Sequence, residues 1–448
     1  MDQGGKSDAM QTGLERACAR LGLGQPDDAK RLTGGATMES WRFHAEGKDY
    51  VLRRAPSMAF MTERPFGHAT EAAIIEAAQK KGVTAPRIAG VLEESDGLGS
   101  GFIMEALPGT PDPRAIQSME TPLQILVEAA GDLARIHSLG ACDLPGDVPV
   151  MEYAEAVANL RQQFEDAGGD RPIIALGLRW LMDNLPDPVE PVLNHGDFRL
   201  GNILAEDSHL TGVLDWELAH FGDWHEDLAF GCMAVWRFGG YDKPALGLGS
   251  LEEYFAAYEE AGGRPVDPAR FRFWTVYRTV WWALGCLKMA SYWRSGEDRM
   301  LERVVISRRT SEQELDLLLL LEEDAPDEER NQSIAPPEAP ETHGEATSGE
   351  VATAISEWLE TIKDRMEGHD RFQLAVARNA LGMIARDDAL MPVEGDAELA
   401  EALLEGEIDL ASPGLLAELR ETAFAKLSAD VPKYPSLAVA RRQWIGDD

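Results

Sequence analysis

Alternating apolar and polar residues near the start of the chain predict a small antiparallel sheet. Apolar and polar residues alternate over 41–45, residues 46–49 hold a glycine-containing turn, and residues 50–54 are expected to form the returning strand. Period-two patterns on either side of a turn are typical of a β-hairpin. Residues 31–33 predict a further strand ahead of it. Residues 1–30 have apolar positions at helical spacing and predict a helical lead-in.

Helical spacing dominates the middle of the chain. Thr70 is placed to cap a helix over residues 71–80, and Gly82 follows its end. The pair Thr121-Pro122 predicts another helix start, because Thr suits the N-cap and Pro the first turn. Residues 151–185 are amphipathic. These elements predict an α+β chain in which a sheet precedes a mainly helical region.

The chain changes character after residue 321. Residues 322–350 contain ten acids, one arginine and two adjacent prolines. The segment has almost no large apolar residues, which predicts a linker that cannot fold by itself. From residue 351 onward apolar stripes return, and Ser412-Pro413 predicts the start of a further helix. Residues 351–448 are therefore expected to form a small helical bundle.

The strongest chemical signal lies on a short hairpin. Residues 192–194, 203–204 and 211–214 are apolar and predict three strands, with a turn at 206–208. The polar residues of this region fall at the strand ends. A rigid hairpin would hold such loops close together.

Three of those polar residues are suited to phosphoryl transfer. Asp197 could orient an attacking hydroxyl, while Asn202 and Asp215 could hold Mg²⁺ on nucleotide phosphates. The alternative is that they only form turns, in which Asp and Asn are common for backbone reasons. The second aspartate at this distance, with strands on both sides, favours the chemical interpretation.

This arrangement resembles the catalytic loop of the aminoglycoside phosphotransferase and choline kinase-like family, part of the protein-kinase-like superfamily. The shared pattern is H-G-D-x-x-x-x-N followed by D-W-E, matched by His195, Gly196, Asp197, Asn202, Asp215 and Glu217. The resemblance implies a two-lobed kinase-like fold, with an antiparallel-sheet N-lobe and a helical C-lobe. It also implies Asp197 as catalytic base, and Asn202 and Asp215 as ligands of Mg²⁺.

The same resemblance implies a nucleotide site on the N-lobe. ATP is the expected phosphate donor, with GTP as an alternative. Gly34 and Gly35 form a loop that could approach the phosphates, although adjacent glycines often mark a simple turn. Arg53 lies near the end of the strand predicted over residues 50–54 and is the expected phosphate cation, with Arg54 as the rival.

Two further nucleotide-site positions follow from the resemblance. Glu71 corresponds to the helix glutamate that pairs with the strand cation, and Glu76 is the alternative. First-turn glutamates are also common because they suit the helix dipole. Glu105 and Ala106 correspond to the hinge, whose backbone would hydrogen-bond the adenine.

The resemblance covers residues 25–320 and sets the expected boundaries. Residues 1–106 form the N-lobe with its lead-in, 107–321 the C-lobe, 322–350 the linker and 351–448 the bundle. The last segment is similar to an uncharacterised domain that is sometimes appended to kinases of this type. A docking or dimerising role is expected for it, so a homodimer is one expectation.

Charge and composition limit the partners. The formal net charge is −36, which argues against nucleic acid and against anionic lipid. No apolar run has the length of a membrane span. The four cysteines are far apart and predict reduced thiols in a cytoplasmic protein. Local cations can still bind ATP, because exposed charges are screened over about 8 Å.

The sequence therefore predicts an enzyme that transfers the γ-phosphate of ATP to an alcohol group of a small hydroxylated metabolite. The alternative is a non-catalytic nucleotide-binding or scaffold protein that works through its C-terminal helical domain. A protein kinase is disfavoured, because the loop reads H-G-D with D-W-E instead of H-R-D with D-F-G.

Overall fold

The computed structural model describes residues 3–32, 38–55, 61, 64–337, 346–390 and 395–446. The chain divides into two compact units. The first contains Met1–Met151 and Pro188–Phe271, and the second contains Glu152–Asp187 and Arg272–Asp448. The strands and the candidate catalytic loop belong to the first unit.

A five-stranded antiparallel sheet forms the N-terminal part of the first unit. Its order is β1-β2-β3-β5-β4. The strands are β1 (Asp27–Arg31), β2 (Glu39–Ala45), β3 (Lys48–Arg54), β4 (Ile88–Val91) and β5 (Gly101–Glu105). The predicted hairpin is present as β2 and β3, with Glu46 and Gly47 in its turn at positive φ.

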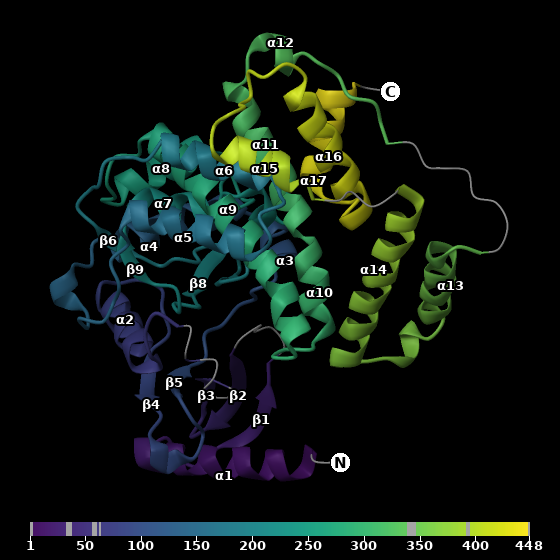
Figure 1. Cartoon of the computed structure of the whole chain (residues 1–448). Helices are drawn as coiled ribbons and strands as arrows, with labels where there is room; N and C mark the ends of the chain where they lie inside the picture. Colours follow the sequence, from purple (N-terminus) through teal and green to yellow (C-terminus); the bar gives the residue numbers. More distant parts are fainter. Residues whose placement is uncertain are drawn as a thin grey trace. The chain divides into compact units, whose positions relative to one another are not determined.

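Two helices cover the sheet, one on each face (Figure 1). They are α1 (Gln3–Leu21) and α2 (His68–Lys80). The alternation of side chains along a strand decides which face each residue joins. On β5, Ile103 packs in the core that contains α1, whereas Phe102 packs in the core that contains α2.

The rest of the first unit is mainly helical. Its longer helices are α3 (Pro113–Gln117), α4 (Pro122–Ile136), α7 (Trp224–Phe230) and α8 (Leu251–Glu260). Two small strand pairs stand among them: β6 (Val192–Asn194) with β9 (His220–Gly222), and β7 (Ile203–Glu206) with β8 (His209–Val213). The β7–β8 turn is formed by Asp207 and Ser208, both at positive φ, as tight hairpins prefer.

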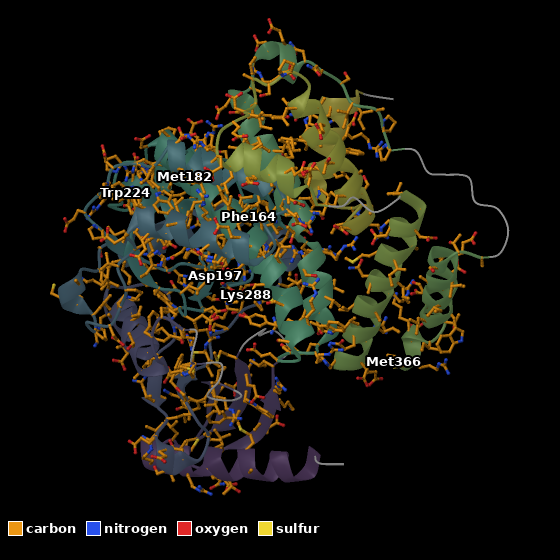
Figure 2. The ribbon with its side chains drawn as sticks, viewed as in Figure 1. Phe164, Met182, Asp197, Trp224, Lys288 and Met366 are labelled. Atoms are coloured by element: carbon orange, nitrogen blue, oxygen red, sulfur yellow. The ribbon has the colours of Figure 1, made fainter. Side chains whose placement is uncertain are left out.

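The second unit is helical throughout its described residues. Its helices are α5 (Tyr153–Asp166), α6 (Pro172–Asp183), α9 (Pro268–Ser295, begun in the first unit), α10 (Leu301–Arg308), α11 (Thr310–Leu321), α12 (Asp327–Arg330), α13 (Ser348–Glu360), α14 (Gly368–Leu390), α15 (Ala397–Leu404), α16 (Leu415–Asp430) and α17 (Pro435–Ala440). Helices α13 and α14 pack side by side, and Met366 lies at the turn between them (Figure 2).

The first part of the predicted linker is ordered, which composition did not indicate. Helix α12 lies within it, and Ile334 is buried. The reason is a buried arginine on α16. Arg420 is 3% exposed and donates to Glu322 Oε2 at 2.9 and 3.0 Å and to the carbonyl oxygens of Arg330 and Gln332. Residues 338–345 of the linker lie outside the described residues.

Two helix starts differ from the predicted positions. Helix α2 begins at His68 after Gly67, because the Thr70 hydroxyl donates to Asp147 Oδ2 at 2.6 Å and does not cap. Helix α16 begins at Leu415, after Gly414 at positive φ, and not at Ser412-Pro413. None of the helices in the described part of the chain combines the length and apolarity that a bilayer crossing requires.

Candidate active site

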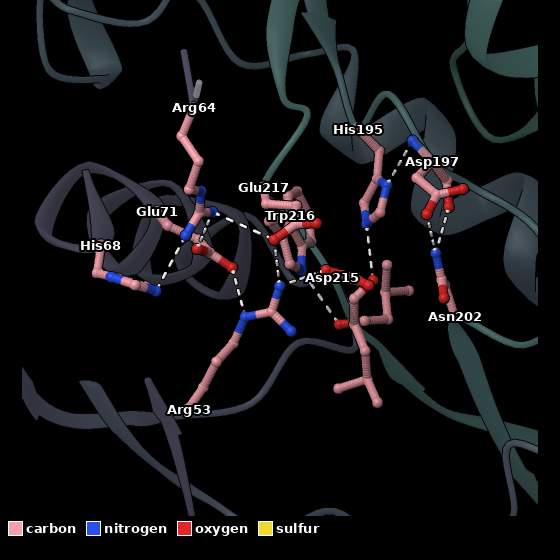
Figure 3. Close-up of polar contacts among 12 residues, drawn as sticks. Arg53, Arg64, His68, Glu71, His195, Asp197, Asn202, Asp215, Trp216 and Glu217 are labelled. Carbon is pink, nitrogen blue, oxygen red and sulfur yellow. Dashed lines mark hydrogen bonds and ion pairs between the residues drawn. The ribbon is translucent and has the colours of Figure 1, made fainter. Parts of the chain in front are cut away.

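The loop between β6 and β7 carries Asp197 and Asn202 in direct contact (Figure 3). The amide nitrogen of Asn202 donates to Asp197 Oδ2 at 2.6 Å and to the Asp197 carbonyl oxygen at 3.0 Å. This bond orients the Asn202 amide, so its own carbonyl oxygen points away from the Asp197 carboxylate. The two residues therefore form one polar unit.

Asp227, at the start of α7, holds this loop from within the core. Its carboxylate accepts the backbone N–H of His195 at 2.5 Å and of Gly196 at 2.8 Å. Burial acts to raise the pKa of Asp227, but hydrogen bonds from His137 and the loop hold it below its usual value. Gly196 is required here, since φ is +82° and a Cβ would lie 2.3 Å from the Leu218 carbonyl oxygen.

His195 connects the loop that carries Asp197 and Asn202 to the segment that carries Asp215. Its Nδ1 accepts the backbone N–H of Asp197 at 3.2 Å, and its Nε2 donates to the Leu214 carbonyl oxygen at 3.0 Å. Accepting at one nitrogen and donating at the other requires the neutral ring. Burial lowers the pKa of His195, in agreement with that state.

The Asp197 carboxylate lies in a partly buried environment, where it pairs with an arginine. Burial raises its pKa to about 6, although the nearby Arg199 acts in the opposite direction. Arg199 Nε donates to Asp197 Oδ1 at 2.7 Å, and its guanidinium stacks 4.2 Å from the ring centroid of Trp236. The sequence analysis missed Arg199. A cation two residues after Asp197 was the signal that could have revealed it.

Asp215 faces a cluster of charged side chains on the other side of His195 (Figure 3). Its Oδ1 lies 2.5 Å from Arg53 Nη2, which also contacts Glu217 Oε2 at 2.8 Å. Burial acts to raise the pKa of Asp215, but Arg53 lowers it below its usual value. Burial and the neighbouring Asp215 charge raise the pKa of Glu217 to about 7.

Strand alternation explains why Arg53, and not Arg54, reaches this cluster. Tyr50 and Leu52 of β3 pack in the core with α1, so Arg53 projects from the opposite face. Arg54 follows Leu52 onto the α1 side. There its Nε lies 3.1 Å from Glu39 Oε2, and its Nη1 donates to the carbonyl oxygen of Leu98 at 3.2 Å.

Glu71 on α2 is the helix carboxylate that meets Arg53. Its side chain is 1% exposed, and Oε1 lies 3.2 Å from Arg53 Nε. The rival Glu76 is about half exposed and lies 4.0 Å from Lys80, one turn along the helix surface. The geometry therefore brings Glu71, and not Glu76, to Arg53.

Arg64 and His68 complete the cluster, and the sequence analysis missed both. Arg64 Nη2 contacts Glu71 Oε2 at 2.6 Å, and its Nη1 lies 2.9 Å from His68 Nε2. His68 Nδ1 lies 2.8 Å from the Ser100 hydroxyl. Burial, together with the charges of Arg64 and Arg53, lowers the pKa of His68 to about 3. The ring is therefore neutral at physiological pH.

The lowered pKa of His68 predicts a measurable loss of folding stability in acid. An unfolded histidine titrates near pH 6.5. Between about pH 6 and 4 the unfolded chain therefore binds a proton at this position that the folded chain does not. Stability rises with pH there and falls as the pH is lowered. Relative to His68→Gln, the wild type should lose about 1.4 kcal/mol more per pH unit in this window, as measured by urea unfolding at several pH values. Parallel curves for the two proteins would contradict the prediction.

The remaining predicted nucleotide-site residues differ in what can be said of them. Gly34 and Gly35 lie outside the described residues, so their role stays a prediction. Glu105 closes β5, and its carboxylate pairs with Lys48 at 2.9 Å and Arg87 at 3.2 Å. The backbone N–H of Glu105 donates to the Arg87 carbonyl oxygen, and that of Ala106 to the Asp49 carbonyl oxygen.

The donor atoms near Asp197 suit a hard cation in kind. Asp215 offers a carboxylate and Asn202 an amide oxygen, both of which Mg²⁺ accepts. Within the described ranges, no group of three or more His, Cys, Asp or Glu side chains is arranged to hold a metal ion. Mg²⁺ commonly needs only one or two protein carboxylates when phosphates supply further ligands. The residues present therefore fit a metal brought with a nucleotide.

Comparison with known families agrees with this geometry. Residues 28–274 match the model of a phosphotransferase enzyme family, APH, over more than half of the chain. The chain belongs to the APH phosphotransferase family. This membership supports phosphoryl transfer to a small molecule. Residues 364–434 match a domain of unknown function, DUF6285, within the segment predicted to be an appended helical domain.

Relatives and solved structures add detail to the APH assignment. Acyl-CoA dehydrogenase family member 10 of Mus musculus is 29% identical over 269 residues, which is 55% of this chain and 25% of that protein. Member 11 of the same species is 37% identical over 165 residues, covering 32% of this chain and 20% of that protein. The chain thus aligns with a quarter or less of these relatives' lengths.

A solved structure confirms the predicted kinase-like fold. A putative aminoglycoside phosphotransferase from Ralstonia eutropha superposes with a TM-score of 0.56 at 19% identity. The match covers 69% of this chain and 98% of that one. At this level of identity the likeness concerns the fold only. The antiparallel sheet followed by helices is therefore the two-lobed arrangement that the sequence motifs implied.

Proposed function

We propose that this member of the APH family transfers the γ-phosphate of ATP to a hydroxyl group of a small metabolite. The observation that carries the proposal is the linked geometry of Asp197, Asn202 and Asp215. Asn202 donates to Asp197, and His195 joins that loop to Leu214, the residue before Asp215. His195 thus ties the loop that carries Asp197 and Asn202 to the segment that carries Asp215. Phosphoryl transfer depends mainly on the positioning of such groups.

Asp197 is the proposed catalytic base. A base works best when its pKa lies near the working pH, and burial raises that of Asp197 to about 6. It would accept the proton of the acceptor hydroxyl as the oxygen attacks the γ-phosphate. Arg199 holds the Asp197 carboxylate at 2.7 Å. The base therefore keeps a fixed orientation toward the acceptor.

Asn202 and Asp215 are the proposed ligands of Mg²⁺. The Asn202 amide nitrogen is used by Asp197, which leaves its oxygen for a cation. When bound, Mg²⁺ would neutralise charge on the nucleotide phosphates. Asp215 Oδ1 lies 2.5 Å from Arg53 Nη2, so a cation bound at that oxygen would displace Arg53. Arg53 would then be available to a phosphate oxygen, for which its planar guanidinium is suited.

The hinge residues Glu105 and Ala106 are proposed to contact the adenine. Their backbone N–H groups already donate to Arg87 and Asp49 carbonyl oxygens. An adenine ring would therefore contact the backbone carbonyl groups of this segment and not its N–H groups. An assay that compares ATP with GTP tests the resulting base preference.

The acceptor is proposed to be a hydroxylated metabolite and not an antibiotic. Two mouse relatives are named as acyl-CoA dehydrogenase family members, which suggests metabolic chemistry. An acceptor panel should therefore contain hydroxyacyl thioesters together with amino alcohols, sugars and aminoglycosides. Acceptor-dependent ADP release from ATP, absent in Asp197→Asn, would support the proposal. Thermal stabilisation by Mg·ATP without transfer to any member of the panel would favour a non-catalytic nucleotide-binding protein.

A further inference from the structure

A second arginine shares the carboxylates that surround Arg53. Arg64 Nη2 lies 2.6 Å from Glu71 Oε2 and 3.6 Å from Glu217 Oε2. Its side chain is 7% exposed. The cluster drawn in Figure 3 thus sets the guanidiniums of Arg53 and Arg64 against the carboxylates of Glu71, Asp215 and Glu217. The family resemblance assigned no role to Arg64.

Glu71 makes a shorter contact with Arg64 than with Arg53. Arg64 donates a hydrogen bond of 2.6 Å to Glu71 Oε2. Arg53 Nε is 3.2 Å from Glu71 Oε1, and this nitrogen makes no hydrogen bond. A carboxylate as buried as Glu71 is strongly destabilising when it has no charged partner. Arg64 is therefore the residue that can hold Glu71 without Arg53.

His68 fixes the direction of Arg64. The neutral ring accepts from Arg64 Nη1 at 2.9 Å, and its Nδ1 side faces the Ser100 hydroxyl at 2.8 Å. His68 itself is 1% exposed. A chain of hydrogen bonds thus runs from the start of β5 through α2 to the carboxylate of Glu71. This support does not involve Arg53.

We propose that Arg64 is a positioning residue of the nucleotide site, which holds Glu71 while Arg53 turns from Asp215 to the phosphates. This inference rests on the proposed function. Arg53 Nη2 contacts both Asp215 and Glu217. A cation at Asp215 Oδ1, with a phosphate engaging Arg53, would separate that pair. Arg64 stays on Glu71 during the exchange and keeps α2 in place beside β3.

The test is equilibrium binding of Mg·ADP to the full chain, with the melting temperature measured in parallel. Arg64→Gln should weaken Mg·ADP binding roughly tenfold or more, a common loss when an outer partner of a site is removed. Arg64→Lys should recover part of the affinity, because it keeps the charge. Arg54→Gln is the matched control. It removes the neighbouring cation on β3 from the α1 face and should leave affinity unchanged.

A double-mutant cycle separates positioning from direct phosphate binding. In a Glu71→Gln background, Arg64→Gln should have little further effect on Mg·ADP affinity. An equal loss in both backgrounds would overturn the proposal, as would a lower melting temperature with unchanged affinity. Wild-type protein that binds Mg·ADP alongside an unaffected Arg64→Gln variant would overturn the Arg64 role alone. Wild-type protein that binds no nucleotide would overturn the proposed function itself.

Discussion

Replacing Asp197 by asparagine should lower turnover by roughly 10²–10⁴-fold, the usual contribution of a general base. Asparagine keeps the shape of the side chain but cannot take the proton of the acceptor hydroxyl. The Asn202 contact to the Asp197 backbone carbonyl at 3.0 Å does not depend on the carboxylate, so the loop should persist. Initial rates of acceptor-dependent ADP release measure the effect, and Mg·ADP binding should stay within a fewfold of wild type.

The matched control for this substitution lies in the neighbouring β7–β8 turn. Asp207→Asn makes the same chemical change at an exposed turn position with positive φ, where asparagine is equally suited. Its turnover should equal that of the wild type. Full activity in Asp197→Asn would remove Asp197 from the chemical step. An equal loss in both variants would point to a general structural effect in this region.

Asp215→Asn should impair both turnover and metal-dependent nucleotide binding. The substitution removes the negative charge proposed to bind Mg²⁺. Loss of one charge-assisted contact is worth about 1.5–3 kcal/mol, which corresponds to a roughly ten- to hundredfold weaker Mg·ATP affinity. The decisive measurement is nucleotide affinity as a function of Mg²⁺ concentration. The Mg²⁺ dependence should become shallow in the variant.

Glu217→Gln provides the comparison for Asp215→Asn. Both residues contact Arg53 Nη2, at 2.5 Å from Asp215 and 2.8 Å from Glu217, but only Asp215 is a proposed ligand. A variant that merely releases Arg53 should therefore behave like Glu217→Gln and keep its Mg²⁺ dependence. If the two variants lose Mg²⁺ dependence equally, the metal role cannot belong to Asp215 alone.

Local patterns were sufficient to predict much of the fold. The alternation in residues 41–45 and 50–54 corresponds to β2 and β3, and the Thr121-Pro122 start corresponds to α4. These elements are specified by neighbours in sequence. Helix α2 was misplaced at its start because Thr70 bonds to Asp147, 77 residues away. A contact of that range leaves no trace in local propensity.

The same distinction applies to the candidate site. Asp197, Asn202 and Asp215 belong to two neighbouring segments of one sequence motif. The alternation of side chains along a strand could by itself have distinguished Arg53 from Arg54. Arg64 and His68 could not be found in this way. Their importance depends on the burial of Glu71 beside them, which only the packed structure reveals. Likewise, Glu322 was assigned to a linker because its partner Arg420 lies 98 residues further on.

The backbone at Asp215 affects how substitutions at this position should be interpreted. Its φ of 68° lies in the left-handed region, which aspartate and asparagine enter more readily than other non-glycine residues. An alanine or valine here would add conformational strain to the loss of the carboxylate. Scanning mutagenesis with alanine would thus exaggerate the chemical importance of Asp215. Random libraries selected for folding should recover asparagine, and glycine for its backbone freedom, as the replacements that least lower stability.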